Sequence, residues 1–442
     1  MKIAMIGMGY VGLVSGVCFS DFGHEVACVD KDASKVARLE AGEVPIFEPG
    51  LETLLASNTS AGRLSFTTDL ARAVEGAEAV FIAVGTPSRR GDGHADLSYV
   101  MAAAEEVARA ATGPVVIVTK STVPVGTNRR VAEAVRAANP ALDFDVASNP
   151  EFLREGAAID DFMRPDRVIV GVETARAAEV MADVYRPLFL RDFPIVTTDL
   201  ESAEMIKYAA NAFLATKITF INEIAALCER TGADVREVAK GIGLDGRIGN
   251  KFLHAGPGFG GSCFPKDTRA LARIGQEHAL PMAITETVIA VNEAIKKRMI
   301  DKCLDLLDGS FNGKRIAVLG VTFKPNTDDM REAPSLTLVP ALVGGGAEVV
   351  AVDPEGRREG EALLPRVAWD ADPYSAAKGA DLLVILTEWN AFRALDLARI
   401  AGTMARPRMA DLRNVYSADA AREAGFDAYV AVGRSGFGPN AA

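Results

Sequence analysis

The hydrophobic residues of the first 150 positions are gathered in short runs that alternate with longer amphipathic stretches. Runs of this kind stand at 2–6, 25–29, 79–84, 115–118 and 145–147. Short apolar runs separated by stretches long enough for a helix are typical of the buried strands of a parallel sheet. The pattern predicts an α/β domain.

The pattern changes from Leu200 to about Arg230, where apolar residues occupy most of the circumference of one long helix. A helix that is apolar nearly all round is normally buried between partners. We expect this helix to separate two domains and to be a candidate for the core of a dimer.

A helical pattern continues to about residue 307, and short apolar runs then return at 314–320, 348–353 and 381–386, with a helix near 336–343. The expected fold class is therefore α/β, with two Rossmann-like doubly wound domains joined by the long central helix and a helical region. The expected domains are residues 1–199, 200–308 and 309–442.

Composition narrows the class of protein. The net charge of −11 argues against nucleic acid or an anionic membrane as a partner, because such surfaces attract basic patches. The five scattered cysteines suit reduced thiols, and no apolar run reaches the roughly 18 residues of a membrane span. The four histidines lack the spacing of zinc ligands. We expect a cytoplasmic protein without a metal site.

Candidate chemistry begins at the end of the first strand, where Gly7, Gly9 and Gly12 form the pattern GxGxxG and open a helical stretch. In this setting the glycines allow a tight turn and a close approach of a pyrophosphate to the helix N-terminus. The next strand ends at Asp30, whose carboxylate can accept both ribose hydroxyls and would repel a 2′-phosphate. The pattern predicts NAD rather than NADP. Lys35 either contacts the adenosine ribose or is a solvated helix residue.

Two threonines follow later strands of the same domain. Thr86 follows the run at 79–84, and Thr122 follows the run at 115–118. Ligands of open α/β sheets bind beyond the carboxyl ends of the strands, so both threonines are expected near the nicotinamide half of the cofactor. Capping of a helix is the alternative for either one.

Glu151 and Glu155 come after the run at 145–147. Residues four apart share one face if their segment is helical, and the position at a strand end favours a role in the site. In the alternative interpretation, Arg154 and solvent satisfy these charges without any function.

Lys207 and Asn211 lie four residues apart on the long helix, so both project from one face. An ammonium and an amide that point into a dry site can stabilise a developing oxyanion. A lysine that reaches solvent along its stem, beside an amide with ordinary hydrogen bonds, is the alternative.

Cys263 lies in a glycine-rich bend, shortly before Lys266 and Asp267. The glycines let another molecule approach the main chain, the lysine favours a thiolate, and the carboxylate can orient water. A small hydrophobic residue in a turn is the alternative. The combination favours a dehydrogenase that holds its product covalently.

The second α/β domain lacks GxGxxG, so we expect it to bind something other than a dinucleotide. After its first strand, Phe323, Lys324 and Arg331 offer an aromatic ring and two cations suited to nucleotide phosphates.

These motifs, in this order, resemble those of the nucleotide-sugar 6-dehydrogenases, the UDP-glucose/GDP-mannose dehydrogenase family, over nearly the whole chain. The resemblance rests on segments 7–12, 85–87, 121–124, 149–153, 207–211, 260–267 and 323–332. Within the family, segments 245–253 and 411–413 look most like those of the enzymes that act on UDP-glucose. The GDP-mannose and UDP-N-acetylmannosamine enzymes share the core motifs but differ in those segments.

The resemblance implies a four-electron oxidation of UDP-glucose at C6 to UDP-glucuronate by NAD, for polysaccharide precursor synthesis, in a homodimer or higher homo-oligomer. The intermediates would be a thiohemiacetal and a thioester on Cys263. The catalytic residues would be Cys263, Lys207, Asn211, Asp267, Thr122 and Glu151. The cofactor would contact Gly7, Gly9, Val11, Gly12, Asp30, Lys35, Thr86, Thr122, Glu155, Lys266 and Arg331. The substrate would contact Glu151, Phe152, Leu153, Arg154, Glu155, Lys207, Asn211, Phe252, Leu253, His254, Ala255, Gly256, Gly260, Phe323, Lys324 and Arg413, with Arg247 reaching the site of a neighbouring subunit.

Two other classes stay open. One is a two-electron dehydrogenase of the β-hydroxyacid type, which has a similar helix lysine and needs no nucleophilic cysteine. The other is a nucleotide-binding scaffold without chemistry. The presence of Cys263, Lys207 and Asp267 in one chain disfavours both.

Overall fold

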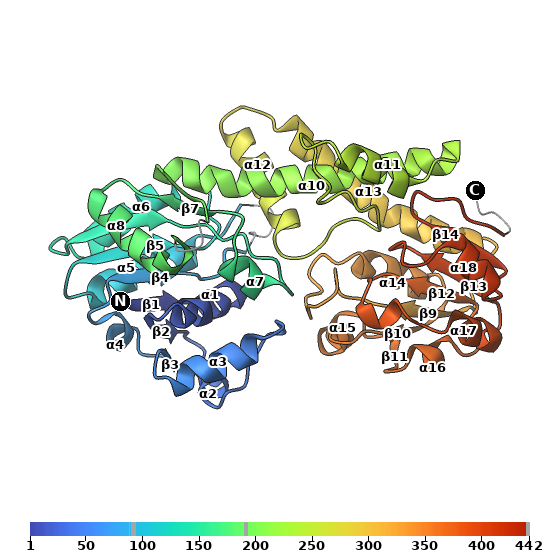
Figure 1. Ribbon diagram of the computed structural model, residues 1–442, viewed down its shortest axis with the longest axis horizontal. Coiled ribbons are helices and arrows are strands. Elements are labelled where there is room, and N and C mark those ends of the chain that lie inside the picture. Colours follow the sequence, from blue (N-terminus) through green and yellow to red (C-terminus); the bar gives the residue numbers. More distant parts are fainter. Residues whose placement is uncertain (88, 90–93, 190–192, 439–442) are drawn as a thin grey trace. The chain divides into compact units, whose positions relative to one another are not determined.

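The computed structural model describes residues 1–87, 89, 94–189 and 193–438 (Figure 1). The chain divides into two compact units, an N-terminal unit, Met1–Ala210, and a C-terminal unit, Asn211–Ala442. The boundary falls inside helix α10 (Leu200–Thr231), the long helix that the sequence predicts. The division into three domains stays a prediction.

The N-terminal unit is built on one sheet with the strand order β3-β2-β1-β4-β5-β6-β7-β8. Neighbouring strands are parallel except β6 and β7, which meet in antiparallel fashion at Ser148 and Gly171. The strands are β1 Lys2–Ile6, β2 Glu25–Val29, β3 Leu64–Thr67, β4 Ala79–Ile82, β5 Val115–Thr119, β6 Phe144–Ser148, β7 Val168–Gly171 and β8 Ile195–Thr198.

Helices cover both faces of this sheet (Figure 1). On one face Leu13 and Phe19 of α1 pack in a buried apolar cluster with Phe162 of α7, and on the other Val100 and Val107 of α5 pack in a second cluster. The helices are α1 Tyr10–Asp21, α2 Ala33–Glu40, α3 Leu51–Ser60, α4 Leu70–Val74, α5 Ser98–Ala110, α6 Thr127–Ala138, α7 Ala158–Met163, α8 Ala175–Val184 and α9 Arg186–Phe189.

The C-terminal unit holds a second sheet, fully parallel, with the order β11-β10-β9-β12-β13-β14. Its strands are β9 Arg315–Leu319, β10 Glu348–Val352, β11 Ala368–Trp369, β12 Leu382–Ile385, β13 Arg408–Asp411 and β14 Ala428–Ala431. Its helices are α11 Val235–Gly243, α12 Phe264–Glu277, α13 Ala283–Leu306, α14 Ser335–Gly344, α15 Arg357–Leu363, α16 Pro373–Ala377, α17 Leu397–Thr403 and α18 Ala418–Glu423, with the short 3-10 helix η1 Asn390–Phe392. The predicted fold class is confirmed.

The strands β3-β2-β1-β4-β5-β6 of the first sheet follow the same order as the six strands of the second. The turn after the first strand is also similar in the two sheets. Directly after the first strand of each stands a glycine in the left-handed region, Gly7 with φ +95° and Gly320 with φ +87°. Asp30 and Asp353 follow the second strand of each. Asp353 is buried and accepts hydrogen bonds from main-chain groups and from the indole of Trp389, so its carboxylate is used within the fold.

Candidate functional site

The glycine turn after β1 has the geometry that a dinucleotide requires. A Cβ added to Gly12 would lie 1.9 Å from the carbonyl oxygen of Gly7, so a side chain there would drive α1 off the turn. At Gly9, by contrast, no atom of the described residues other than Gly9 and its two chain neighbours lies within 4 Å of the Cβ position. The turn is therefore closed on the protein side at Gly12 and open to an approaching pyrophosphate at Gly9.

Asp30 stands at the end of β2, beside this turn. Its carboxylate accepts hydrogen bonds from the main-chain N–H of Met8 at 2.9 Å and of Asp32 at 3.1 Å, and from Lys35 at 3.0 Å. Partial burial raises the pKa of Asp30, but these hydrogen bonds outweigh burial and hold the pKa below its usual range. An ionised carboxylate at this place fits the ribose of NAD. The structure places Lys35 against Asp30, where it orients that carboxylate.

The two predicted threonines lie together. The hydroxyl of Thr86, after β4, donates to the main-chain carbonyl of Thr122, after β5, at 2.9 Å. The strand order brings these two loops to adjacent strand ends, as expected from the parallel pairing of β4 and β5.

Glu151 and Lys207 form a buried ion pair. The ammonium of Lys207 donates to the main-chain carbonyl of Glu151 at 2.6 Å and to its carboxylate at 3.0 Å. Burial raises the pKa of Glu151, but the charge and hydrogen bonds of Lys207, with the N–H of Leu153 and the charge of Lys120, hold it below its usual range. The pair fixes the segment after β6 on helix α10.

The expectation that Glu151 and Glu155 share a helical face is wrong. Residues 151–154 have no regular secondary structure, and α7 begins only at Ala158. The carboxylate of Glu151 turns inward and accepts a hydrogen bond from the N–H of Leu153 at 2.6 Å, which closes a tight loop in place of a helical turn.

Arg154 is held by a carboxylate of the same loop region. Its guanidinium donates to Asp161 at 2.6 Å, and its main-chain N–H donates to the same carboxylate at 2.8 Å. Arg154 thus pairs with Asp161 and Glu151 with Lys207, so the alternative in which Arg154 satisfies the charge of Glu151 is wrong.

Sequence reasoning missed Arg167. Arg167 directly precedes β7, and its guanidinium lies 3.6 Å from the centre of the Phe152 ring. The Lys207 ammonium lies 5.1 Å from the same ring centre. Cations favour the faces of aromatic rings, so both hold the ring of Phe152 in place.

Sequence reasoning also missed a buried polar group around Lys120, at the end of β5. The Lys120 ammonium donates to the side-chain oxygen of Asn149 at 3.0 Å and to the hydroxyl of Tyr185 at 3.3 Å. Burial lowers the pKa of Lys120 to about 8, with Glu151 opposing the shift and Lys207 adding to it. The only sequence signal was the position of Lys120 directly before the 121–124 motif.

In the C-terminal unit, Asn211 and Asp267 are joined. The side-chain amide of Asn211 donates to one carboxylate oxygen of Asp267 at 2.7 Å, and Lys266 donates to the other at 2.6 Å. Cys263 is partly buried at the residue that precedes α12, with the hydroxyl of Ser262 at 3.6 Å from its sulfur. The hydrogen bonds from Asn211 and Lys266 fix the carboxylate of Asp267 on the first turn of α12, the helix that begins directly after Cys263.

The glycine-rich bend packs closely on the loop after β9. The N–H of Gly261 donates to the carbonyl of Arg331 at 2.8 Å, and a Cβ added to Gly260 would lie 2.5 Å from the carbonyl oxygen of Glu332. Gly261 has φ +81°, and a Cβ there would lie 2.8 Å from the ring of Phe323. Two segments that the sequence singled out separately are thus one structural feature.

The predicted substrate loop, residues 252–256, joins the same region. Gly256 donates its N–H to the side-chain oxygen of Asn222 at 2.9 Å, and Phe252 has φ +65°, which L-residues rarely adopt. Arg413 donates to the carbonyl of Phe323 at 2.7 Å. The ammonium of Lys324 lies 5.3 Å from the centre of the Phe323 ring.

The remaining predicted residues either belong to the loop 252–256 or are arginines paired with a nearby aspartate. Leu253 and Ala255 are buried, and His254 is exposed. Arg247 is exposed and pairs with Asp245 at 2.6 Å, and Arg331 pairs with Asp329 at 2.8 Å.

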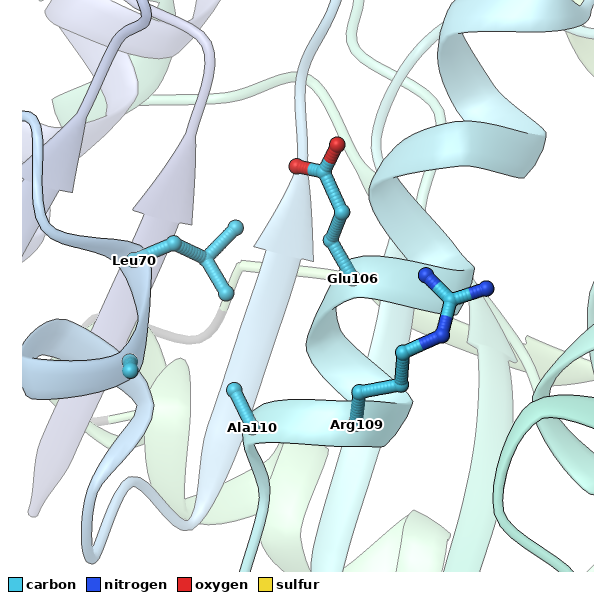
Figure 2. Close-up of a pocket in the computed structure, with 5 residues that line it drawn as sticks. Leu70, Glu106, Arg109 and Ala110 are labelled. Carbon is cyan, nitrogen blue, oxygen red and sulfur yellow. The ribbon is translucent and has the colours of Figure 1, made fainter.

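A hollow of about 380 Å³ lies on the N-terminal unit, away from these residues. Figure 2 shows Leu70, Glu106, Arg109 and Ala110 around it. Glu106 is engaged by Lys31 at 2.7 Å and Arg109 by Glu105 at 2.7 Å, so the charges at its rim are already paired. None of the site residues predicted from the sequence lines it.

Two other features are absent from the described ranges. No helix in that part of the chain combines the length and apolar character needed to cross a bilayer. The same residues hold no group of three or more His, Cys, Asp or Glu side chains placed to bind a metal ion.

Models of three domains of the UDP-glucose/GDP-mannose dehydrogenase family match the chain in order. The NAD binding domain matches residues 1–189, the central domain residues 201–294, and the UDP binding domain residues 317–418. The chain is 59% identical to the UDP-glucose 6-dehydrogenase of Rhizobium meliloti, over 98% of this chain and 100% of that one.

Solved structures give the same result. A UDP-glucose dehydrogenase from Pyrobaculum islandicum matches with a TM-score of 0.89 at 42% identity, over 97% of this chain and 96% of that one. The UDP-D-ManNAc dehydrogenase of Pyrococcus horikoshii matches with a TM-score of 0.85 at 26% identity, over 98% and 99%. The fold is therefore almost equally close to enzymes named for different sugars, whereas sequence identity separates them.

Proposed function

Because this chain belongs to the UDP-glucose/GDP-mannose dehydrogenase family, we propose that it oxidises UDP-glucose at C6 to UDP-glucuronate in two steps, through a covalent intermediate on Cys263. One observation carries the proposal. Helix α10 bears Lys207 and Asn211 one turn apart, and each is joined to a buried carboxylate, Glu151 and Asp267 respectively.

NAD is the cofactor, as the match to the NAD binding domain indicates. The open main chain at Gly9 suits its pyrophosphate, and the ionised carboxylate of Asp30 suits its adenosine ribose. By family analogy, Glu155, Lys266 and Arg331 also contact it. When bound, the nicotinamide accepts a hydride in each of the two oxidations.

In the first oxidation, Lys207 and Asn211 stabilise the charge on the C6 oxygen, and Lys207 takes the hydroxyl proton as the hydride leaves C6. The Cys263 thiolate then adds to the aldehyde carbon, and Lys207 returns its proton to the oxygen, which gives a thiohemiacetal. Lys207 and Asn211 also stabilise the charge on the oxygen of this adduct. The hydrogen bonds of both side chains to fixed carboxylates support this role, because they hold the donors in place.

In the second oxidation, loss of a hydride from the thiohemiacetal carbon leaves a thioester on Cys263. Water adds to that carbon, the carbon–sulfur bond breaks, and the carboxylate leaves with Cys263 again a thiolate. Asp267, Thr122 and Glu151 position and activate the water. The two hydrogen bonds that fix the oxygens of Asp267 support its assignment.

The C-terminal unit binds the nucleotide part of the substrate. Phe323 and Lys324 offer a ring and a cation for the uridine diphosphate, and the close packing of Gly260 and Gly256 against neighbouring segments gives the loops a defined shape. Sequence identity to UDP-glucose enzymes favours UDP-glucose over GDP-mannose and UDP-N-acetylmannosamine. Cys263 at the start of the helix that carries Asp267 favours this chemistry over a two-electron dehydrogenase or an inactive scaffold.

The protein works as a homodimer or higher homo-oligomer. Phe213, Phe220 and Leu227 lie seven residues apart on α10, and their side chains are 66%, 48% and 59% exposed. Residues spaced by seven lie along one stripe of a helix, and a large apolar stripe of this kind is a protein-binding surface. A second copy of the chain is the partner that we propose.

The cytoplasm is the compartment that suits this protein. Its five cysteines are all free thiols, which a reducing environment preserves. There it would supply UDP-glucuronate for polysaccharide synthesis.

The decisive experiment counts the NADH formed for each UDP-glucose consumed. Two NADH support the four-electron reaction, one would indicate a two-electron dehydrogenase, and none would indicate a scaffold. The same assay with GDP-mannose and UDP-N-acetylmannosamine tests the sugar. A higher kcat/KM with either one would overturn the assignment of UDP-glucose.

A further inference from the structure

Two lysines and one carboxylate are buried together in the N-terminal unit. Lys120, Lys207 and Glu151 are 2%, 3% and 6% exposed. Glu151 pairs directly with Lys207, whereas the hydrogen-bond acceptors of Lys120, the side-chain oxygen of Asn149 and the hydroxyl of Tyr185, are neutral. A buried ammonium with neutral partners holds its proton weakly, because burial disfavours the charged form.

The surroundings of Lys120 are mostly apolar. Its ammonium lies 5.9 Å from the ring centre of Phe19 and 5.7 Å from that of Phe162. The titratable and charged groups that face it are Cys18 of α1, Glu151 after β6, Tyr185 after α8 and Lys207 of α10. The thiol of Cys18 and the phenol of Tyr185 are buried groups whose pKa is raised by burial, so both are neutral at pH 7.

The two lysines act on each other through Glu151. A carboxylate at 3.0 Å favours the protonated form of Lys207. The ammonium of Lys120 acts on the same carboxylate and repels that of Lys207. Groups coupled in this way titrate as a set, so the loss of one ammonium strengthens the hold on the other proton.

We propose that Lys120 is a positioning residue for the oxidation: its charge beside the Glu151–Lys207 pair keeps Lys207 able to accept a proton near neutral pH. The inference rests on the proposed function, in which the hydroxyl proton of C6 passes to the neutral amine of Lys207 while the hydride passes to NAD⁺. Lys120 itself touches neither substrate nor cofactor in this proposal. Through Asn149 it also fixes the segment that leads to Glu151.

The first test changes the charge at position 120 and leaves the other side chains of the site unchanged. Lys120→Met and Lys120→Gln remove the ammonium, Lys120→Arg retains a positive charge, and Lys31→Met removes an exposed lysine that pairs with Glu106. We expect the acid limb of the pH profile of kcat/KM to move up by about one unit in Lys120→Met and Lys120→Gln. The value at pH 7 then falls about tenfold and recovers above pH 9, whereas Lys120→Arg and Lys31→Met keep the profile of the parent protein.

A second measurement does not depend on the sugar nucleotide. The rate at which acetic anhydride acetylates Lys207, followed by mass spectrometry across pH, reports the neutral fraction of that amine. Its midpoint is expected to rise by about one unit in Lys120→Met and Lys120→Gln. An unchanged midpoint would overturn the proposal, as would an equal fall in kcat/KM at every pH. Failure of the parent protein to oxidise UDP-glucose would instead reject the proposed function, and the labelling would still decide the role of Lys120.

Discussion

Asn211 donates its side-chain amide to Asp267 at 2.7 Å, and both side chains are buried. Lys266 takes the other oxygen of the same carboxylate at 2.6 Å. Asp267 also donates its main-chain N–H to the carbonyl of Cys263 at 2.8 Å, so the carboxylate and the thiol belong to one helical turn. These hydrogen bonds tie the Asp267 carboxylate to Asn211 of α10 and to Lys266, and its main chain to Cys263.

The first prediction concerns the thiol of Cys263. Cys263→Ala should abolish UDP-glucuronate formation and leave the Kd for UDP-glucose within about threefold, because the thiol forms the intermediate but does not carry the fold. Product analysis and calorimetry measure the two effects. Cys228→Ala, at a buried cysteine of α10, is the control and should keep two NADH per sugar. Sustained acid formation by Cys263→Ala would exclude the covalent route.

The second prediction concerns cofactor choice. The carboxylate of Asp30 repels the 2′-phosphate of NADP, so kcat/KM should favour NAD by about a hundredfold or more. Asp30→Asn keeps the shape and removes the charge, and the preference should fall to roughly tenfold or less. Glu43→Gln, at an exposed carboxylate that pairs with Arg38, is the control and should retain the preference. Equal efficiency of the parent protein with both cofactors would contradict the assignment.

The strands and the cofactor turn could be predicted because their signals are local. The runs at 2–6 and 25–29 coincide with β1 and β2, and the glycines between them mark a turn that only glycine fits. In the second sheet, the run at 314–320 exceeds β9 by one residue at each end, and the run at 348–353 exceeds β10 by one residue at its C-terminal end, since strand ends depend on pairing.

The partners of the buried polar residues could not be predicted in this way. Arg167, directly before β7, meets Phe152 of the irregular segment after β6 through tertiary packing. Lys120 meets Asn149 and Tyr185 through tertiary packing, which leaves no periodic trace in the sequence. The helical expectation for Glu151 failed for the same reason, since its inward ion pair with Lys207 overrides spacing.

The third prediction is a pH dependence of stability. The pKa of Glu151 is depressed in the folded protein, so its contribution is present above the unfolded pKa of about 4.3 and is lost as pH falls through the lower folded value. Glu151→Gln should therefore lower the free energy of unfolding at pH 7 by about 3 kcal/mol, because it leaves Lys207 buried without its carboxylate. Denaturant unfolding should show the difference shrinking below about pH 4. A difference that stays constant from pH 7 to pH 3 would contradict the ion-pair account.

The fourth prediction concerns the apolar stripe of α10. Phe213→Glu combined with Phe220→Glu places two charges on the surface proposed to face a second copy, where each ring would otherwise be buried. Loss of about 3 kcal/mol in association weakens a dimer about a hundredfold, so the variant should sediment as a monomer at concentrations where the parent protein sediments as a dimer or larger. Leu363→Glu, at an exposed leucine of α15, is the matched control and should keep the parent mass. Circular dichroism separates dissociation from unfolding. A folded double variant with the parent mass would show that the stripe is not the contact between subunits.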